Sequence, residues 1–261
     1  MKIVAVIPAR MASSRFPGKP IAKLAGLPMI QHVWARARMC KKLDAVYVAT
    51  CDEQIRDVAR SFGAEAIMTS DRHERASDRM AEVAGSVQAD VYVLIQGDEP
   101  MIRPSMIDLA LEPLERDASV VCSNLAAPIH SEEEFMDRNT VKVVMDSKGD
   151  ALYFSRSPMP YPFTQPFRQV RAFKQVCIIP FRAGFLHTYT RLSPTPLETA
   201  ESIDMLRALE HGFPVRLVEC YAETHSVDTA GDLARVEALM REDSLLPSYS
   251  SGGRFGRSAT E

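Results

Sequence analysis

The chain has 261 residues, enough for one large domain or two modest ones with a sizeable core. Hydrophobic residues make up 46% and charged residues 25%, which is ordinary for a globular protein. The formal net charge of −3 creates no overall attraction for nucleic acid or an anionic membrane, so any anion site has to be local.

The five cysteines are widely spaced and form no CxxC pair, a pattern typical of reduced thiols rather than of disulfides or a zinc site. The continuous apolar run before Pro8 has only five residues, too few for the core of a signal peptide, and no apolar run is long enough to cross a bilayer. We therefore expect a cytoplasmic protein.

The first half of the chain alternates between two kinds of segment. Apolar runs predict strands at 2–7, 45–50, 64–68, 90–96 and 119–125. Amphipathic stretches predict helices from Pro28, at 52–62, at 76–87 and from about Pro104. Strands that are apolar throughout and separated by helices indicate an α/β fold, with a mostly parallel sheet covered on both faces. Ligands bind beyond the carboxyl ends of such strands.

After residue 130 the pattern changes. A hairpin is predicted at 140–146 and 151–156, followed by a proline-rich loop, an apolar run at 176–181, a helix at 196–211, a strand at 214–220 and a helix at 229–241. We expect residues 1–241 to form a single domain. Within it, 135–190 would be a β-rich insertion used by a substrate or a partner subunit. Residues 242–261, rich in Gly and Ser, are predicted to be a disordered tail.

The loop after the first strand carries Arg10, Arg15 and Lys19 beside Ser13 and Ser14. It is not a P-loop, because that motif places Gly five positions before Gly18 and Ser or Thr after Lys19. These residues could present cations and hydroxyls to a triphosphate, or they could form a solvated basic loop. An exposed cation such as Lys19 is expected to contribute little to folding.

Acidic residues follow another predicted strand. Asp98 in "QGDEP" is a suitable oxygen ligand for Mg²⁺, and Asp228 precedes the last predicted helix. Both also fit simpler interpretations, because acidic side chains are common near helix N-termini and Asp is a frequent N-cap.

Several segments in register resemble one family. The chain is similar to the 3-deoxy-manno-octulosonate (Kdo) cytidylyltransferases from residue 2 to about 241. The motifs that carry this resemblance are "IPAR", "RFPGKP", "QGDEPMI", "VKVVMD", "ALYFSR", "RAGF", "PLETAE" and "VDTAGDL".

The resemblance implies a glycosyltransferase-A-like nucleotidyltransferase of lipopolysaccharide biosynthesis. It would join CMP from CTP to a sugar acid, release pyrophosphate, use Mg²⁺ and form a homodimer. Catalytic roles are implied for Arg10, Lys19 and Asp98, with Asp98 and Asp228 as metal ligands. Nucleotide contacts are implied for Ser14, Arg15, Ala76, Ser77, Arg79 and Gln96.

On the acceptor side, Arg156 is the expected partner of a carboxylate, because a guanidinium can bind it through two hydrogen bonds. Gln175, Glu198 and Glu201 are implied as further acceptor contacts. Glu198, Glu201 and Asp204 recur every three residues on the predicted helix, so they would share a face, which could equally be a solvated acidic face.

Two departures from the family pattern concern substrate choice. Near the cytosine the family has Ser-Gly-Thr-[DE]-Arg where this chain has Arg75-Ala76-Ser77-Asp78-Arg79. In the acceptor pocket it has His-x-Gly-Ile-Tyr where this chain has residues 175–179, "QVCII". We therefore expect the acceptor to be Kdo or a related acidic sugar. A phosphonate or another ulosonic acid is an alternative acceptor. A nucleotide-binding homologue without turnover is an alternative to the enzyme itself.

Overall fold

The first of two large sheets is mostly parallel, as predicted. A computed structural model of the chain describes residues 1–12 and 16–250. The sheet has the strand order β11-β6-β1-β4-β5, in which only β11 is antiparallel to its neighbour. Its strands are β1 (Ile3–Ala9), β4 (Ala45–Thr50), β5 (Glu65–Met68), β6 (Val91–Ile95) and β11 (Ile178–Arg182).

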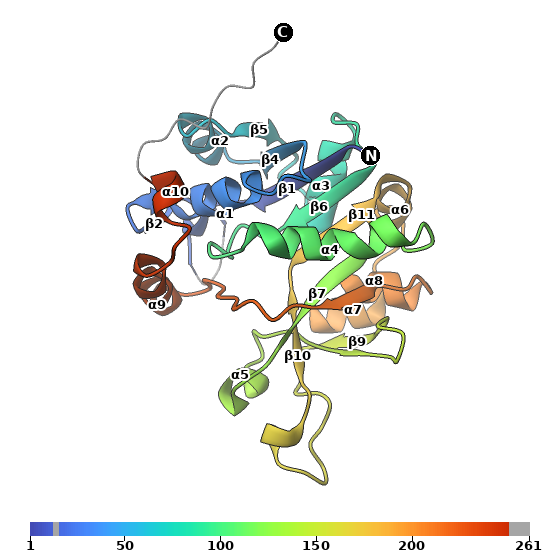
Figure 1. The fold of residues 1–261 in the computed structure, drawn as a ribbon. Coiled ribbons are helices and arrows are strands. Elements are labelled where there is room, and N and C mark those ends of the chain that lie inside the picture. The colour runs from blue at the N-terminus through green and yellow to red at the C-terminus, as the bar shows by residue number, and fades with distance from the viewer. Residues whose placement is uncertain (13–15, 251–261) are drawn as a thin grey trace.

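Helices cover both faces of this sheet, which explains why its strands are apolar throughout (Figure 1). One core cluster joins the sheet to α1 (Met29–Arg38), α2 (Glu53–Ser61) and α4 (Pro104–Arg116). A second cluster joins it to α3 (Ala76–Ala84) and α6 (Ala183–Tyr189). Among the described residues, no helix is long and apolar enough to span a membrane.

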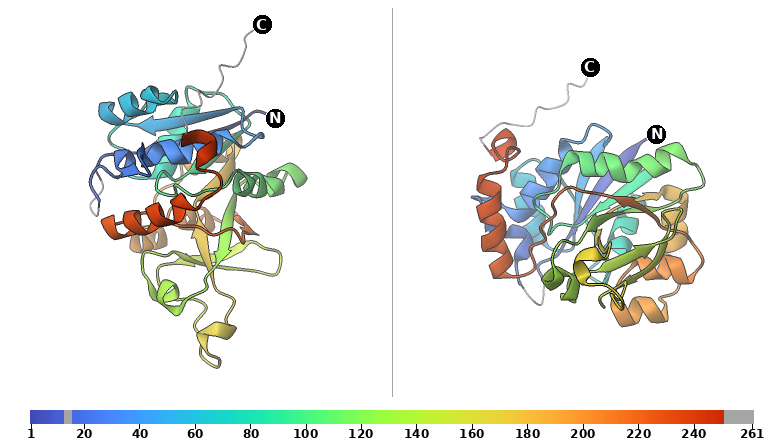
Figure 2. Two further views of the ribbon diagram at one scale, coloured as in Figure 1. Left: turned by 60° about the vertical axis from the view of Figure 1, so that its left-hand side comes forward. Right: turned by 60° about the horizontal axis from the view of Figure 1, so that its bottom comes forward.

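The second sheet is mostly antiparallel and has the order β12-β7-β10-β8-β9. Its strands are β7 (Ser123–Pro128), β8 (Lys142–Met145), β9 (Ala151–Ser155), β10 (Phe173–Val176) and β12 (Arg216–Glu219). The predicted hairpin is β8–β9. Because β7 and β12 come from outside 135–190, the expected insertion shares its sheet with the rest of the domain. Between β9 and β10 the chain extends away from the body of the molecule (yellow in Figure 2).

The strand order creates a switch point between β1 and β6. From β1 the chain moves to β4 and β5 on one side, and it later enters β6 on the other side. Such a point opens a crevice beyond the strand ends. The loop after β6 runs close to the end of β1, since a Cβ on Gly97 would lie 3.2 Å from the carbonyl oxygen of Pro8. A larger residue at position 97 would therefore force this loop away from the strand.

Several short elements were not predicted. They are the 3-10 helix η1 (Lys19–Ile21), the small hairpin β2 (Lys23–Leu24) and β3 (Leu27–Pro28), α5 (Glu132–Met136) and the 3-10 helix η2 (Phe167–Gln169).

The prediction of one helix over 196–211 was wrong. The structure has α7 (Pro196–Glu201) and α8 (Met205–Glu210), separated at Ser202, whose left-handed backbone (φ 55°) ends α7. Asp204 lies beyond this break. Glu198, Glu201 and Asp204 therefore do not share the face of a single helix.

Part of the predicted disordered tail is folded. After α9 (Ala230–Arg241) the chain forms α10 (Pro247–Ser250), which packs beside α1 (Figure 1). Tyr249 is buried there, and Arg36 forms an ion pair with Asp243. The rest of the predicted tail, 251–261, lies outside the described residues.

A buried hydrogen-bond chain joins α10 to α1. The Arg36 Nε–H donates to the Tyr249 hydroxyl at 2.9 Å, and that hydroxyl donates to His32 Nδ1 at 3.0 Å. His32 Nε2–H in turn donates to the carbonyl of Leu24 at 2.7 Å. Burial, the largest cause, lowers the pKa of His32 to about 4.

This lowered pKa predicts a loss of stability in acid. Between about pH 6.5 and 4 the unfolded chain binds a proton at His32 that the folded chain excludes, so the free energy of unfolding should fall as the pH falls. The loss should reach about 3 kcal/mol, at about 1.4 kcal/mol per pKa unit. Urea titrations across this range should show a smaller pH slope for His32→Gln than for the wild type. The exposed His187→Gln should keep the wild-type slope.

Candidate active site

A cleft of about 1140 Å³ opens at the ends of β1 and β6 and is bounded by both sheets. It collects most of the residues that the sequence singled out. Those that line it are Arg10, Lys19, Ala76, Arg79, Gln96, Asp98, Arg156, Gln175 and Asp228. Ser14 and Arg15 lie outside the described residues, and Ser77, Glu198 and Glu201 do not line the cleft.

At the centre of the cleft, Lys19 bridges two carboxylates. Its ammonium donates to Asp98 Oδ2 at 2.8 Å and to Asp228 Oδ1 at 3.3 Å, which joins chain segments up to 209 residues apart. The backbone supports this arrangement, because the Val227 N–H donates to the carbonyl of Asp98 at 2.9 Å. The Lys19 side chain is only 14% exposed, so the expectation of an exposed cation was wrong.

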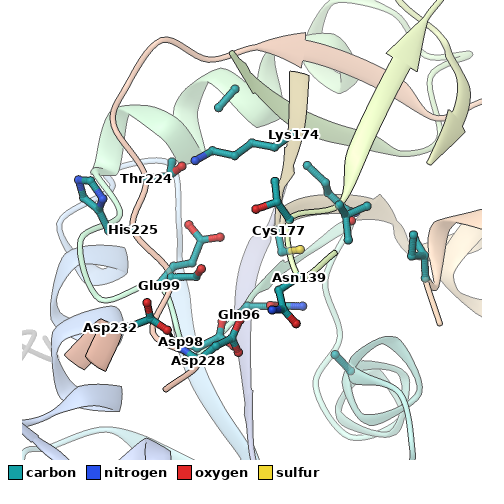
Figure 3. A pocket seen from close by; sticks show the side chains of 18 of the residues that line it. Gln96, Asp98, Glu99, Asn139, Lys174, Cys177, Thr224, His225, Asp228 and Asp232 are labelled. Atoms are coloured by element: carbon teal, nitrogen blue, oxygen red, sulfur yellow. Dashed lines mark hydrogen bonds between the residues drawn. The ribbon is translucent and has the colours of Figure 1, made fainter. Parts of the chain in front are cut away.

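The same carboxylates could hold a hard cation. Asp98 Oδ1 is buried and has no hydrogen-bond partner. Asp98 and Asp228 lie side by side (Figure 3). Mg²⁺ usually takes one or two protein carboxylates and completes its shell with water and phosphate oxygens. No group of three or more metal-binding side chains occurs among the described residues. The donor set therefore fits a magnesium ion that arrives with a phosphate.

Glu99 and Lys174 extend the cleft beyond these aspartates (Figure 3). Burial, and next the charge of Asp98, raise the pKa of Glu99 to about 7. The Lys174 ammonium pairs with Glu134 and points toward Thr224. Lys174 was not predicted as a site residue, because it lies on an ordinary strand with no motif around it.

The first turn of α3 forms another wall. Ala76 faces the cleft, and Arg79 is anchored by donating to Thr69 Oγ1 and to the carbonyl of Ser70 at 3.2 Å. Ser77 is buried and its hydroxyl donates to Asp204 Oδ2 at 2.9 Å. The Ser77 side chain therefore supports this wall from behind.

Arg156 projects into the cleft from the end of β9 and is held by main-chain carbonyls. Its Nε donates to the carbonyl of Glu201 at 2.6 Å, and its Nη1 and Nη2 donate to those of Arg138 at 3.1 Å and Ser202 at 3.3 Å. A guanidinium has five N–H groups, so donors remain for a ligand. The Glu201 carboxylate accepts from Ser155 Oγ at 2.6 Å and from the Arg156 N–H at 2.9 Å. It faces away from the cleft.

Glu198 is 1% exposed. Arg207 holds its carboxylate through two hydrogen bonds, from Nε at 2.8 Å and from Nη2 at 2.6 Å. A buried carboxylate needs such a partner. The predicted direct contacts of Glu198 and Glu201 with an acceptor are therefore not what this geometry provides, and both residues buttress the wall that carries Arg156.

Gln175, predicted as an acceptor contact, lines the cleft from β10. Its Nε2 donates to Asn124 Oδ1 at 2.6 Å, and Asn124 donates to the carbonyl of Val176 at 2.7 Å. Cys177, which also lines the cleft, follows at the point where the chain passes from β10 to β11.

The chain closely matches known cytidylyltransferases. The family model described as cytidylyltransferase matches residues 4–249. The 3-deoxy-manno-octulosonate cytidylyltransferase of Geobacter metallireducens is 46% identical over 252 residues, which cover 92% of this chain and 99% of the relative. That of Myxococcus xanthus is 44% identical and covers 92% of this chain and 97% of its own length.

This chain belongs to the 3-deoxy-manno-octulosonate cytidylyltransferase family. It is similar to a solved CMP:2-keto-3-deoxy-manno-octonic acid synthetase complexed with CTP, with 42% identity, a TM-score of 0.86, and coverage of 93% of this chain and 99% of that one. The family and enzyme class predicted from the motifs are confirmed.

The bridging position of Lys19 leads to a prediction. In Lys19→Ala, Asp98 and Asp228 face each other without their shared cation, so the free energy of unfolding should fall by about 1 kcal/mol and the melting temperature by about 2–4 °C. Turnover with CTP should fall by about 10²–10³-fold, because one charge-stabilising group is lost. Thermal melts and pyrophosphate release measure the two effects.

The exposed Lys23→Ala, four residues away, is the matched control and should behave as the wild type. If Lys19→Ala uses CTP normally, Lys19 serves only to hold Asp98 and Asp228 together and takes no part in the chemistry.

Proposed function

We propose that the protein transfers CMP from CTP to 3-deoxy-manno-octulosonate or a closely related sugar acid and releases pyrophosphate, in a Mg²⁺-dependent step of lipopolysaccharide biosynthesis. One observation carries the proposal. Lys19, Asp98 and Asp228 meet at the switch point, and Arg156 lines the same cleft. Lys19 and the two aspartates suit phosphates and a metal ion, and Arg156 suits the carboxylate of an organic acid. The names of the relatives support this assignment.

The two halves of the cleft differ in chemistry. The nucleotide half consists of the loop after β1, with Arg10 and Lys19, and the first turn of α3, with Ala76 and Arg79. The acceptor half consists of Arg156 and Gln175. Asp98 lies on the loop after β6, next to both. The Gln96 N–H donates to the carbonyl of Cys177 at 3.2 Å, which ties this loop to the residue that directly follows the strand carrying Gln175.

The proposed reaction needs little covalent chemistry from the protein. A hydroxyl oxygen of the acceptor attacks the α-phosphorus of CTP in line, the bond to the bridging oxygen of pyrophosphate breaks, and the hydroxyl proton is lost to solvent. Negative charge grows on the phosphate oxygens, where Arg10 and Lys19 can neutralise it. Arg156 binds the carboxylate of the acceptor and so holds the acceptor in place. The attack then takes place within one complex instead of between two free molecules.

Asp98 and Asp228 would hold Mg²⁺, which supplies Lewis-acid stabilisation of the charged phosphate oxygens when bound. In the structure, the Lys19 ammonium neutralises both aspartates. We infer that Lys19 shifts toward the triphosphate when the nucleotide arrives, because Mg²⁺ would then need the carboxylates of both Asp98 and Asp228.

We also propose that the acceptor wall of this chain is altered. The amide of Gln175 is engaged with Asn124, and Ile179 lines the cleft with an alkyl group. A site that lacks a hydrogen-bond partner penalises the substrate that requires it. Another ulosonic acid or a phosphonate is the second candidate acceptor, because Arg156 would bind either anion.

We infer a homodimer in the cytoplasm. Tyr161 and Phe163, in the segment that projects between β9 and β10, are 77% and 86% exposed. Exposed aromatic groups of this kind mark interaction surfaces, which supports the expectation that the 135–190 segment contributes to subunit contact.

All five cysteines are free thiols, in keeping with a reducing compartment.

The metal assignment predicts the behaviour of two variants. Asp98→Asn or Asp228→Asn should lower pyrophosphate release from CTP and Kdo by at least about 10²-fold, since each removes a charged ligand. Circular dichroism should show a folded protein, and Asp71→Asn, on an exposed loop, is the control. Full activity of either variant, or of the wild type in EDTA, would remove the metal role.

The acceptor wall predicts a kinetic pattern. Most enzymes reach a kcat/KM of about 10⁴ M⁻¹s⁻¹ or more. We expect the kcat/KM for Kdo to lie below this value. At least one related acid should have a higher kcat/KM than Kdo. Arg156→Ala should raise the KM of the acceptor more than that of CTP. Steady-state kinetics with a panel of sugar acids measures both effects. Efficient turnover of Kdo would show that the altered wall does not change the acceptor.

A further inference from the structure

A second arginine, Arg75, reaches the acceptor wall from the nucleotide side. Arg75 is the N-cap residue of α3, directly before Ala76 in the nucleotide half. It lines the cleft and is 25% exposed. Its Nη1 donates to Ser202 Oγ at 2.9 Å, across 127 positions of sequence.

Ser202 is also the residue through which Arg156 is held. It ends α7 with a left-handed backbone (φ 55°, ψ 50°). This conformation leaves the carbonyls of Glu201 and Ser202 pointing at Arg156, whose Nε and Nη2 donate to them at 2.6 and 3.3 Å. Left-handed backbone is costly for a residue with a Cβ and has to be stabilised by its surroundings. The Arg75 hydrogen bond is one such stabilising contact.

A second contact joins the same two elements. Ser77, in the first turn of α3, donates to Asp204 at the start of α8. Asp204 also lies 3.6 Å from Arg75 Nε. The first turn of α3 therefore touches the break between α7 and α8 on both sides of Ser202.

The nearby buried carboxylates keep hydrogen-bond partners without Arg75. Glu198, 3.7 Å from Arg75 Nε, is neutralised by the paired hydrogen bonds from Arg207. Asp204 keeps its bond from Ser77 but loses its ion pair with Arg75. Replacement of Arg75 therefore removes two contacts, one with Ser202 and one with Asp204, and a variant of Ser202 is needed to separate them.

We propose that Arg75 is a positioning residue that couples the two halves of the cleft: through Ser202 it sets the carbonyls that orient Arg156, so that nucleotide binding at α3 prepares the acceptor site. This inference rests on the proposed function for the identity of the two ligands. Coupling between two sites is reciprocal, so the acceptor should strengthen CTP binding by the same factor.

The kinetic test compares Arg75→Ala with Arg72→Ala, an exposed arginine three residues earlier. Arg75→Ala should raise the KM of Kdo about 10-fold and, by reciprocity, the KM of CTP at saturating Kdo by a similar factor, while kcat and the Kd of CTP without acceptor change less than about 3-fold. Arg75→Lys, which retains a cation that can donate to Ser202, should restore the KM to within about 3-fold of the wild type. Arg72→Ala should match the wild type.

A double-mutant cycle tests the route. Ser202→Ala keeps the Cβ, and therefore the backbone strain, and removes only the hydroxyl that Arg75 contacts. If Arg75 acts through this hydroxyl, Ser202→Ala should raise the KM of Kdo as Arg75→Ala does, and the double variant should add nothing. Effects that multiply in the double variant would overturn the proposal.

A third measurement does not depend on the acceptor. In hydrogen exchange, CTP with Mg²⁺ should slow the backbone amides of 201–206 in the wild type and in Arg72→Ala, but not in Arg75→Ala. No change at 201–206 in the wild type would overturn the coupling. If the wild type shows this protection and yet fails to turn over Kdo, the proposed acceptor is wrong and the coupling stands.

Discussion

The cleft depends on one ammonium group between two carboxylates. Asp98 and Asp228 come from loops 130 positions apart and would repel each other in a partly buried setting if nothing lay between them. Lys19 removes that repulsion and ties both loops to the start of η1. The same geometry serves the chemistry, because a place where a lysine can neutralise two aspartates is also a place where a magnesium ion and a triphosphate can replace it. Under the proposed function, stability and chemistry would share these three residues.

The sheet topology explains why the loops meet there. β1 and β6 are neighbours, and the chain leaves them on opposite sides, so no connection crosses the gap beyond their ends. Gly97 lets the loop after β6 run close to the end of β1. The passage from β10 to β11 then brings the second sheet against this gap, since the two strands belong to different sheets and only Cys177 separates them. The cleft is therefore bounded by a rigid scaffold on both sides.

Arginine residues organise the acceptor wall in three different ways. Arg207 neutralises the buried Glu198, Arg156 is held by main-chain carbonyls and retains donors for a ligand, and Arg75 contacts Ser202. The planar guanidinium can make several directed hydrogen bonds at once, which a lysine cannot reproduce. A left-handed residue at the end of a short helix is the point at which two of these three interactions converge. The wall is consequently sensitive to changes that never touch a substrate.

The sequence by itself determined the class of fold, the family, and the position of the cleft. Continuous apolar strands separated by amphipathic helices have few arrangements that bury both faces of a sheet, and strand ends bearing Lys19 and Asp98 had to meet at one edge. Only the tertiary structure decided where α7 ends, because Ser202 adopts its left-handed backbone among long-range contacts. It also decided that Tyr249 is buried against α1 and that Glu198 faces Arg207 instead of a ligand. Local patterns report which side chains prefer burial or a helix. They do not report which distant partner will neutralise a charge or pin a strained residue, because that depends on contacts between segments that are far apart in the chain.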